Sequence, residues 1–75
     1  MPDTVNTTVH ITREQEKRLY AFISAACEDD PFRYEMIAKK VGRTADGTAS
    51  NWEATIAADW LQSMLQAEAI RKNLH

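Results

Sequence analysis

The sequence contains few residues that could stabilise a small domain through disulfides or metals. One cysteine, Cys27, excludes an intrachain disulfide, and the only histidines, His10 and His75, leave no metal-ligand spacing. No apolar run approaches the ~18 residues needed to cross a membrane. The stretch before His10 lacks the cation and the apolar segment of a signal peptide. We therefore expect a cytoplasmic protein with no metal, no cofactor and no membrane partner.

Residues arranged for catalysis are also scarce. Cys27 follows two alanines, where a small core residue is expected, and no further group stands out to orient His10 as its base. The sequence has no glycine-rich phosphate loop, and 75 residues provide little volume for a substrate pocket. These observations predict a protein that is not an enzyme and has no small-molecule substrate.

The composition is that of one folded domain. Of the 75 residues, 44% are hydrophobic and 27% are charged, and the net charge is −2. A chain this apolar and this weakly charged is expected to fold rather than remain disordered. Its length allows a single domain, residues 1–75. A domain of this size buries a modest core, so its stability is marginal or shared with a partner.

The first part of the chain predicts a strand and a helix. Apolar and polar residues alternate in the N-terminal arm, 1–11, and many are β-branched, which is typical of a short strand. Thr12 precedes Gln15 by three residues. This is the spacing of a capping box, in which each side chain bonds to the other residue's backbone N–H. The sequence therefore predicts a helix over 12–28.

A second helix is predicted to follow directly. Asp30 before Pro31 is a strong start signal, because proline is well tolerated at the first helical position and Asp caps the helix. Gly42 is expected to end this helix, which gives it the range 31–41. A polar loop over 43–51 should follow.

The last helix is predicted over 51–70, because Ser50 and Glu53 have the spacing of another capping box. Helical periodicity across all three helices predicts the core: Leu19, Phe22, Ile23, Ile37, Val41, Leu61 and Leu65. The apolar face of the second helix is expected to comprise Phe32, Met36, Ile37 and Val41.

The pattern resembles the winged helix-turn-helix superfamily. The resemblance rests on three segments: Ile11-Thr12-x-x-Gln15 with Phe22-Ile23, Ile37-Ala38-Lys39-Lys40-Val41-Gly42, and Trp60-Leu61-x-x-Met64-Leu65 with Ile70-Arg71. The opening is also similar to the DNA-binding domain of the bacterial SOS repressor family. The resemblance implies a mainly α, three-helix, winged-helix-like (helix-turn-helix) domain with a short N-terminal strand. Two departures are a loop longer than the usual tight turn and the absence of a wing, so that residues 5–11 would pair with 70–74.

A ribbon-helix-helix dimer also begins with a strand followed by a helix, as in Thr8–Thr12. That fold needs only two helices, however, and the apolar third helix would then be left over. We therefore favour the three-helix fold.

The resemblance implies a dimeric, DNA-binding transcription regulator that binds double-stranded DNA. The candidate nucleic-acid-binding residues are the cations near the third helix and the polar residues at its start: Arg33, Lys39, Lys40, Arg43, Thr44, Thr48, Ser50, Asn51, Arg71 and Lys72. The same residues also suit simpler roles, because lysine and arginine stabilise a helix C-terminus and serine and asparagine cap an N-terminus.

The charge distribution favours a different function. No lysine or arginine lies between Arg43 and Arg71, although this stretch contains four acids. An uncharged-to-acidic third helix is poorly suited to phosphates. The alternative is a protein-interaction module, accessory or inhibitory, that binds a basic protein through Trp52, Glu53 and Asp59. The same surface could also form a homodimer. DNA binding is the leading expectation from the sequence, and the interaction module is the alternative.

Overall fold

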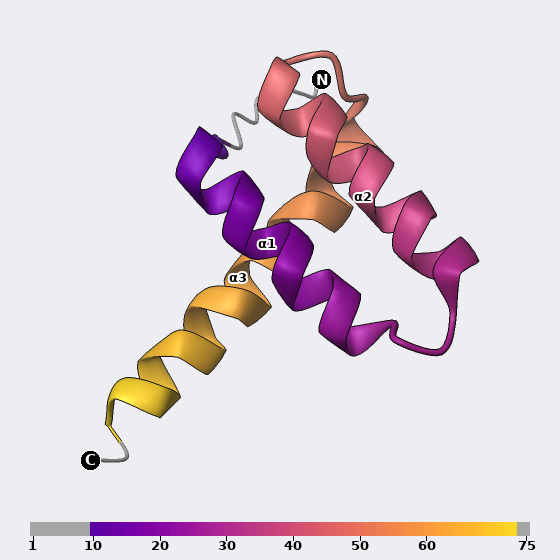
Figure 1. Cartoon of the computed structure of the whole chain (residues 1–75). Coiled ribbons are helices and arrows are strands. Elements are labelled where there is room, and N and C mark those ends of the chain that lie inside the picture. The colour runs from indigo at the N-terminus through magenta and orange to yellow at the C-terminus, as the bar shows by residue number, and fades with distance from the viewer. Residues whose placement is uncertain (1–9, 74–75) are drawn as a thin grey trace.

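The computed structural model describes residues 10–73 and is mainly α-helical. Its helices are α1 (Arg13–Ala26), α2 (Pro31–Asp46) and α3 (Asn51–Lys72). Figure 1 shows α1 and α2 side by side and running in opposite directions, with α3 crossing behind them. Each helix packs against the other two. The C-terminal turns of α3 project beyond α1 (Figure 1).

The described residues contain no strand, and the winged-helix architecture is not apparent among them. His10 and Ile11, the only described part of the predicted arm, are not in a strand, and Ile11 is buried in the core. The rest of the predicted strand and part of its proposed partner, 70–74, lie outside the described residues. Residues 70–72, which do lie within them, belong to α3.

The predicted starts of the helices are confirmed. Thr12 Oγ1 accepts a hydrogen bond from the backbone N–H of Gln15 at 3.1 Å, and Gln15 Oε1 accepts one from Thr12 N–H at 3.0 Å. Asp30 Oδ1 accepts from the backbone N–H of Arg33 at 3.1 Å, with Pro31 at the first helical position. Each cap satisfies an N–H that the helix itself leaves without a partner.

The predicted end of α2 is wrong. The helix continues through Gly42 to Asp46 and ends at Gly47, whose φ of +80° is left-handed. There the backbone N–H of Thr48 donates to Arg43 O at 2.8 Å, which closes the helix as an αL glycine typically does. The predicted loop over 43–51 therefore shrinks to residues 47–50. Gly42 lies inside the helix, and a Cβ there would lie 3.2 Å from the Tyr20 hydroxyl oxygen of α1.

The other two boundaries differ less. The first helix ends at Ala26, two residues early, because Cys27 leaves the helical conformation (φ −113°, ψ 34°). The last helix runs two residues further than predicted, to Lys72.

The core is formed by all three helices. Its buried members are Ile11, Leu19, Ile23, Cys27, Ile37, Val41, Ala57 and Met64. Phe22 and Trp60 pack against this core. Their rings meet edge to face, with centroids 6.0 Å apart. Four of the predicted core residues are buried, and Phe22 and Leu61 are half-buried against them.

Three apolar residues are exposed where sequence periodicity predicted burial. Phe32 and Met36 each precede a buried residue of α2 by five positions, which places them about 140° around the helix from the core side. Their exposed fractions are 78% and 60%. Leu65 is 41% exposed although Met64 beside it is buried, because it lies about 100° around α3 from Met64.

Candidate functional site

The four cations of α2 lie on one side of the helix. At about 100° per residue, Arg33, Lys39, Lys40 and Arg43 fall within an arc of about 120° that excludes the buried side. All four side chains reach the surface, Lys40 only partly. The acids of α2, at positions 35 and 46, are displaced to one edge of this arc. The extension of α2 past Gly42 is what brings Arg43 into this group.

Two exposed apolar residues, Phe32 and Met36, lie within the same arc. They occupy successive turns of the helix, with Lys40 on the next turn. The Lys40 ammonium donates to Met36 O at 3.3 Å, so its side chain folds back toward Met36. This face of α2 therefore alternates exposed apolar groups with cations.

Trp52, in the first turn of α3, extends this face across the α2–α3 junction. The Lys40 Nζ atom lies 5.2 Å from the centroid of the Trp52 ring, which is cation–π geometry. Trp52 is 61% exposed, so its side chain is accessible to a partner. We call Phe32, Arg33, Met36, Lys39, Lys40 and Trp52 the Trp52 surface.

Glu53 is not on the outer face of α3, where the sequence placed it. It is buried, with its carboxylate 2.6 Å from the Arg43 guanidinium. The carboxylate also accepts hydrogen bonds from the Ser50 backbone N–H at 3.1 Å and from the Ser50 hydroxyl at 3.3 Å. The Ser50 N–H, and then Arg43, lower the pKa of Glu53. Glu53 therefore fixes the start of α3 against α2, which contradicts its predicted exposed interface role.

The polar residues predicted to contact bases have different environments. Thr44 is buried, and its hydroxyl donates to Lys40 O at 2.8 Å, so the prediction that it contacts a base is wrong for this conformation. Thr48 is exposed, and its hydroxyl donates to Arg43 O at 3.4 Å. Ser50 caps α3, and Asn51 is exposed beside it.

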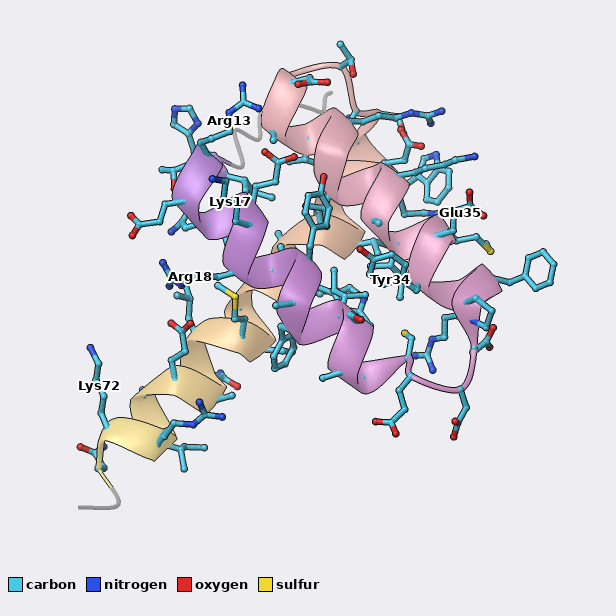
Figure 2. The ribbon with its side chains drawn as sticks, in the orientation of Figure 1. Arg13, Lys17, Arg18, Tyr34, Glu35 and Lys72 are labelled. Atoms are coloured by element: carbon cyan, nitrogen blue, oxygen red, sulfur yellow. The ribbon has the colours of Figure 1, made fainter. Side chains whose placement is uncertain are left out.

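The cations at the end of α3 are far from those of α2. Arg71 lies nineteen residues after Trp52 on one helix, which is about 29 Å along the helix axis. Asp59 is exposed between them, and this stretch has no cation. Figure 2 shows Lys72 near the end of α3, with Arg13, Lys17 and Arg18 along α1, on the opposite side of the molecule from Glu35 of α2. The predicted cations therefore form two separate groups.

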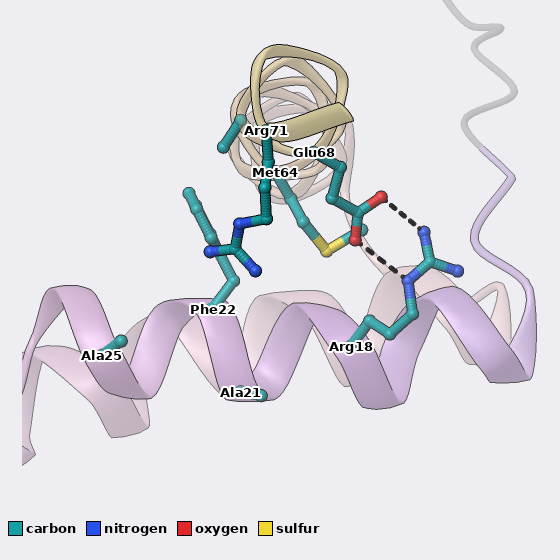
Figure 3. Close-up of a pocket in the computed structure, with 8 residues that line it drawn as sticks. Arg18, Ala21, Phe22, Ala25, Met64, Glu68 and Arg71 are labelled. Atoms are coloured by element: carbon teal, nitrogen blue, oxygen red, sulfur yellow. Dashed lines mark hydrogen bonds and ion pairs between the residues drawn. The ribbon is translucent and has the colours of Figure 1, made fainter. Parts of the chain in front are cut away.

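A groove of about 330 Å³ lies between α1 and the projecting half of α3 (Figure 3). Its lining is mostly apolar and comprises Arg18, Ala21, Phe22, Ala25, Met64, Ala67, Glu68 and Arg71. Arg18 donates to both carboxylate oxygens of Glu68, at 3.1 and 2.8 Å. This pairing lowers the pKa of Glu68 and raises that of Arg18. Sequence reasoning missed the pair because its members are 50 residues apart.

The described residues contain neither a metal-binding cluster nor a membrane-spanning helix. No group of three or more His, Cys, Asp or Glu side chains between residues 10 and 73 is placed to hold a metal ion. None of the described helices is both long and apolar enough to span a membrane.

Comparison with known protein families, curated proteins and solved structures gives no match to this chain. Its function must therefore be inferred from its own surfaces. Among these, the Trp52 surface combines three of the large exposed apolar side chains with three cations of α2.

Proposed function

We propose that this chain is a protein-interaction domain that binds its partner through the Trp52 surface. The observation that supports this proposal is the exposure of three large apolar side chains, Phe32 and Met36 on the face of α2 that carries Lys40, and Trp52 in contact with Lys40. Clustered exposed apolar residues with a polar surround typically mark an interaction site. Tryptophan is the residue type most often found to dominate such interfaces, because it buries a large rigid surface.

The arrangement also resembles an interface in its layout. Trp52 and Met36 would form the apolar centre, and Arg33 and Lys39 would lie at the polar rim. Glu53 and Arg43, paired beneath this surface, hold α3 against α2. The binding residues therefore stand on two helices whose relative position is fixed, which reduces the entropy lost on association.

The test compares the wild-type chain with Trp52→Ala. Truncating a central tryptophan is expected to weaken partner binding by at least about 2 kcal/mol, or roughly 30-fold in Kd. Leu65→Ala is a matched control, because Leu65 is also an exposed apolar residue but lies on the projecting half of α3. Circular dichroism should show equal folding for all three proteins.

Both variants and the wild type are used as baits in quantitative affinity capture from cell extract, and Kd is then measured with the purified partner. Sedimentation of the chain alone tests whether a second copy is the partner. Equal retention of partners by wild type and Trp52→Ala would contradict the proposal.

A second candidate function is binding of double-stranded DNA by a helix-turn-helix. It is favoured by the α2–α3 connection, residues 47–50, which is short and contains a glycine, as in helix-turn-helix motifs. Such a domain would place α3 in the major groove, with Asn51 near bases and Lys39 and Lys40 near phosphates. Membership of the winged-helix superfamily is part of this DNA-binding proposal.

Salt dependence distinguishes this candidate. Binding through phosphates should weaken with a slope of about −0.9 in log K against log salt for each phosphate contacted. Lys39→Ala with Lys40→Ala should weaken binding to every duplex about equally. Fluorescence anisotropy with random duplex is the measurement. Absence of binding at roughly 50 mM salt and tens of micromolar protein would end the DNA proposal, because non-specific binders reach ~10⁻⁴–10⁻⁶ M.

A further inference from the structure

We infer that the partner of the Trp52 surface is an acidic amphipathic helix. This inference rests on the proposed function and adds the chemistry of the partner. It differs from the basic partner that the acids of the third helix suggested, because Glu53 is buried and paired while Lys40 of α2 lies over the Trp52 ring.

Positive charge is left free on this side of α2. Arg43 is paired with Glu53, but the ion pairs of the described residues include none made by Arg33, Lys39 or Lys40. The acids of α2, Glu35 and Asp46, lie just outside the arc, and Asp30 lies at the start of the helix. The arc itself therefore carries only positive charge next to exposed apolar groups, and a complementary partner supplies carboxylates.

The apolar groups are spaced along α2 at intervals of one helical turn. Phe32 and Met36 are one turn apart, and Lys40, whose ammonium contacts the Trp52 ring, is one turn further. The row thus extends about 12 Å along α2. An α-helix that presents apolar residues at i, i+4 and i+7 covers about 10.5 Å, and is therefore matched in length to this row.

Lys40 is positioned so that it can bind a carboxylate of the partner. Its ammonium is held over the Trp52 ring by the cation–π contact and by Met36 O. An ammonium has three donors, so a carboxylate can bind to it while the cation–π contact is kept. A partner residue with an acid next to an apolar neighbour would then contact both Lys40 and Trp52.

The test uses synthetic helical peptides and the fluorescence of Trp52. Trp60→Phe removes the other tryptophan and keeps an aromatic ring against Phe22. Three peptides share leucines at i, i+4 and i+7 and differ only in their remaining positions, which are glutamate-rich, glutamine-rich or lysine-rich. We expect the acidic peptide to change Trp52 emission and to bind about tenfold more tightly than the neutral one, since several exposed charge pairs contribute modestly each.

Two charge-reversal variants locate the effect. Lys39→Glu with Lys40→Glu should weaken acidic-peptide binding about tenfold or more, and binding should fall with added salt. Arg71→Glu with Lys72→Glu makes the same change in net charge about 29 Å away along α3 and should have much less effect. Circular dichroism checks that both variants fold.

The other outcomes separate the two proposals. If the neutral or basic peptide binds at Trp52 as tightly as the acidic one, the acidic partner is refuted and the interaction domain stands. If no peptide alters Trp52 emission, the helical partner is refuted, and partner retention by Trp52→Ala decides whether the interaction domain stands. If a duplex oligonucleotide binds at Trp52 more tightly than the acidic peptide, the acidic partner is refuted in favour of DNA. If the chain self-associates and Trp52→Ala abolishes this, it is refuted in favour of a second copy.

Discussion

Replacing Gly47 with alanine should destabilise the domain by about 1 kcal/mol. With a φ of +80°, this residue adopts a left-handed conformation that costs an L-residue roughly 1–2 kcal/mol. Alanine recovers about 0.4–1 kcal/mol of that cost by restricting the unfolded chain. A Cβ at this position would meet no atom within 4 Å, so no steric cost is added. The net loss is therefore almost entirely conformational.

Gly42→Ala is the matched control. Gly42 lies inside α2, where alanine is favoured over glycine by about 0.5–1 kcal/mol. The new Cβ would lie 3.2 Å from the hydroxyl of Tyr20, at the end of a side chain that can shift slightly. We expect a change between zero and a gain of about 0.5 kcal/mol.

Urea denaturation followed by circular dichroism measures both variants, and an unchanged m-value shows that the midpoint shift reports stability. If Gly42→Ala proves more destabilising than Gly47→Ala, α2 ends at Gly42 as the sequence predicted. In that case the grouping of cations on α2 would also be wrong, because Arg43 would no longer follow the same helix.

Three further substitutions, with Leu65→Ala as a control, test the core and the titrating contacts. Leu19→Ala should cost about 2–5 kcal/mol in urea denaturation, because its side chain is fully buried, whereas Leu65→Ala should cost less than about 1 kcal/mol. The lowered pKa of Glu53 stabilises the folded state above pH 4.5, its ordinary pKa, and this contribution is lost as the pH falls further. Glu53→Gln should therefore flatten the fall in stability at acidic pH. Burial, and then a hydrogen bond to Glu16, raise the pKa of Tyr20 from 10.0 to about 12. Its contribution to the free energy of unfolding is present below pH 10 and lost toward pH 12, so Tyr20→Phe should flatten the fall in stability at alkaline pH. If either variant leaves the pH dependence of stability unchanged, the assignment for that residue is wrong.

The starts of the helices could be predicted from sequence because capping is local. Thr12, Asp30 and Ser50 each act on backbone or side-chain groups within three residues. The end of α2 could not be predicted in this way. Both Gly42 and Gly47 are plausible stops in the sequence, and the choice depends on tertiary packing beyond Gly42, where Thr44 is buried.

The exposed surfaces were harder to predict than the core. Helical periodicity identifies apolar positions but does not say which of them another helix covers. Phe32 and Met36 could have been assigned to the surface only by fixing the phase of α2 from Ile37 and Val41. Leu65 could have been assigned to the surface only by fixing the phase of α3 from Ala57 and Met64. The Arg18–Glu68 pair depends on how α1 and α3 cross.

The candidate interface depends on the same tertiary feature as the end of α2. Because α2 continues past Gly42, Arg43 reaches the buried carboxylate of Glu53 at the start of α3. That contact holds the first turn of α3 against α2 and so positions Trp52 beneath Lys40. A helix ending at Gly42 would leave both the ion pair and the cation–π contact without support. The termination at Gly47 therefore determines both the stability of the domain and the surface that we propose binds its partner.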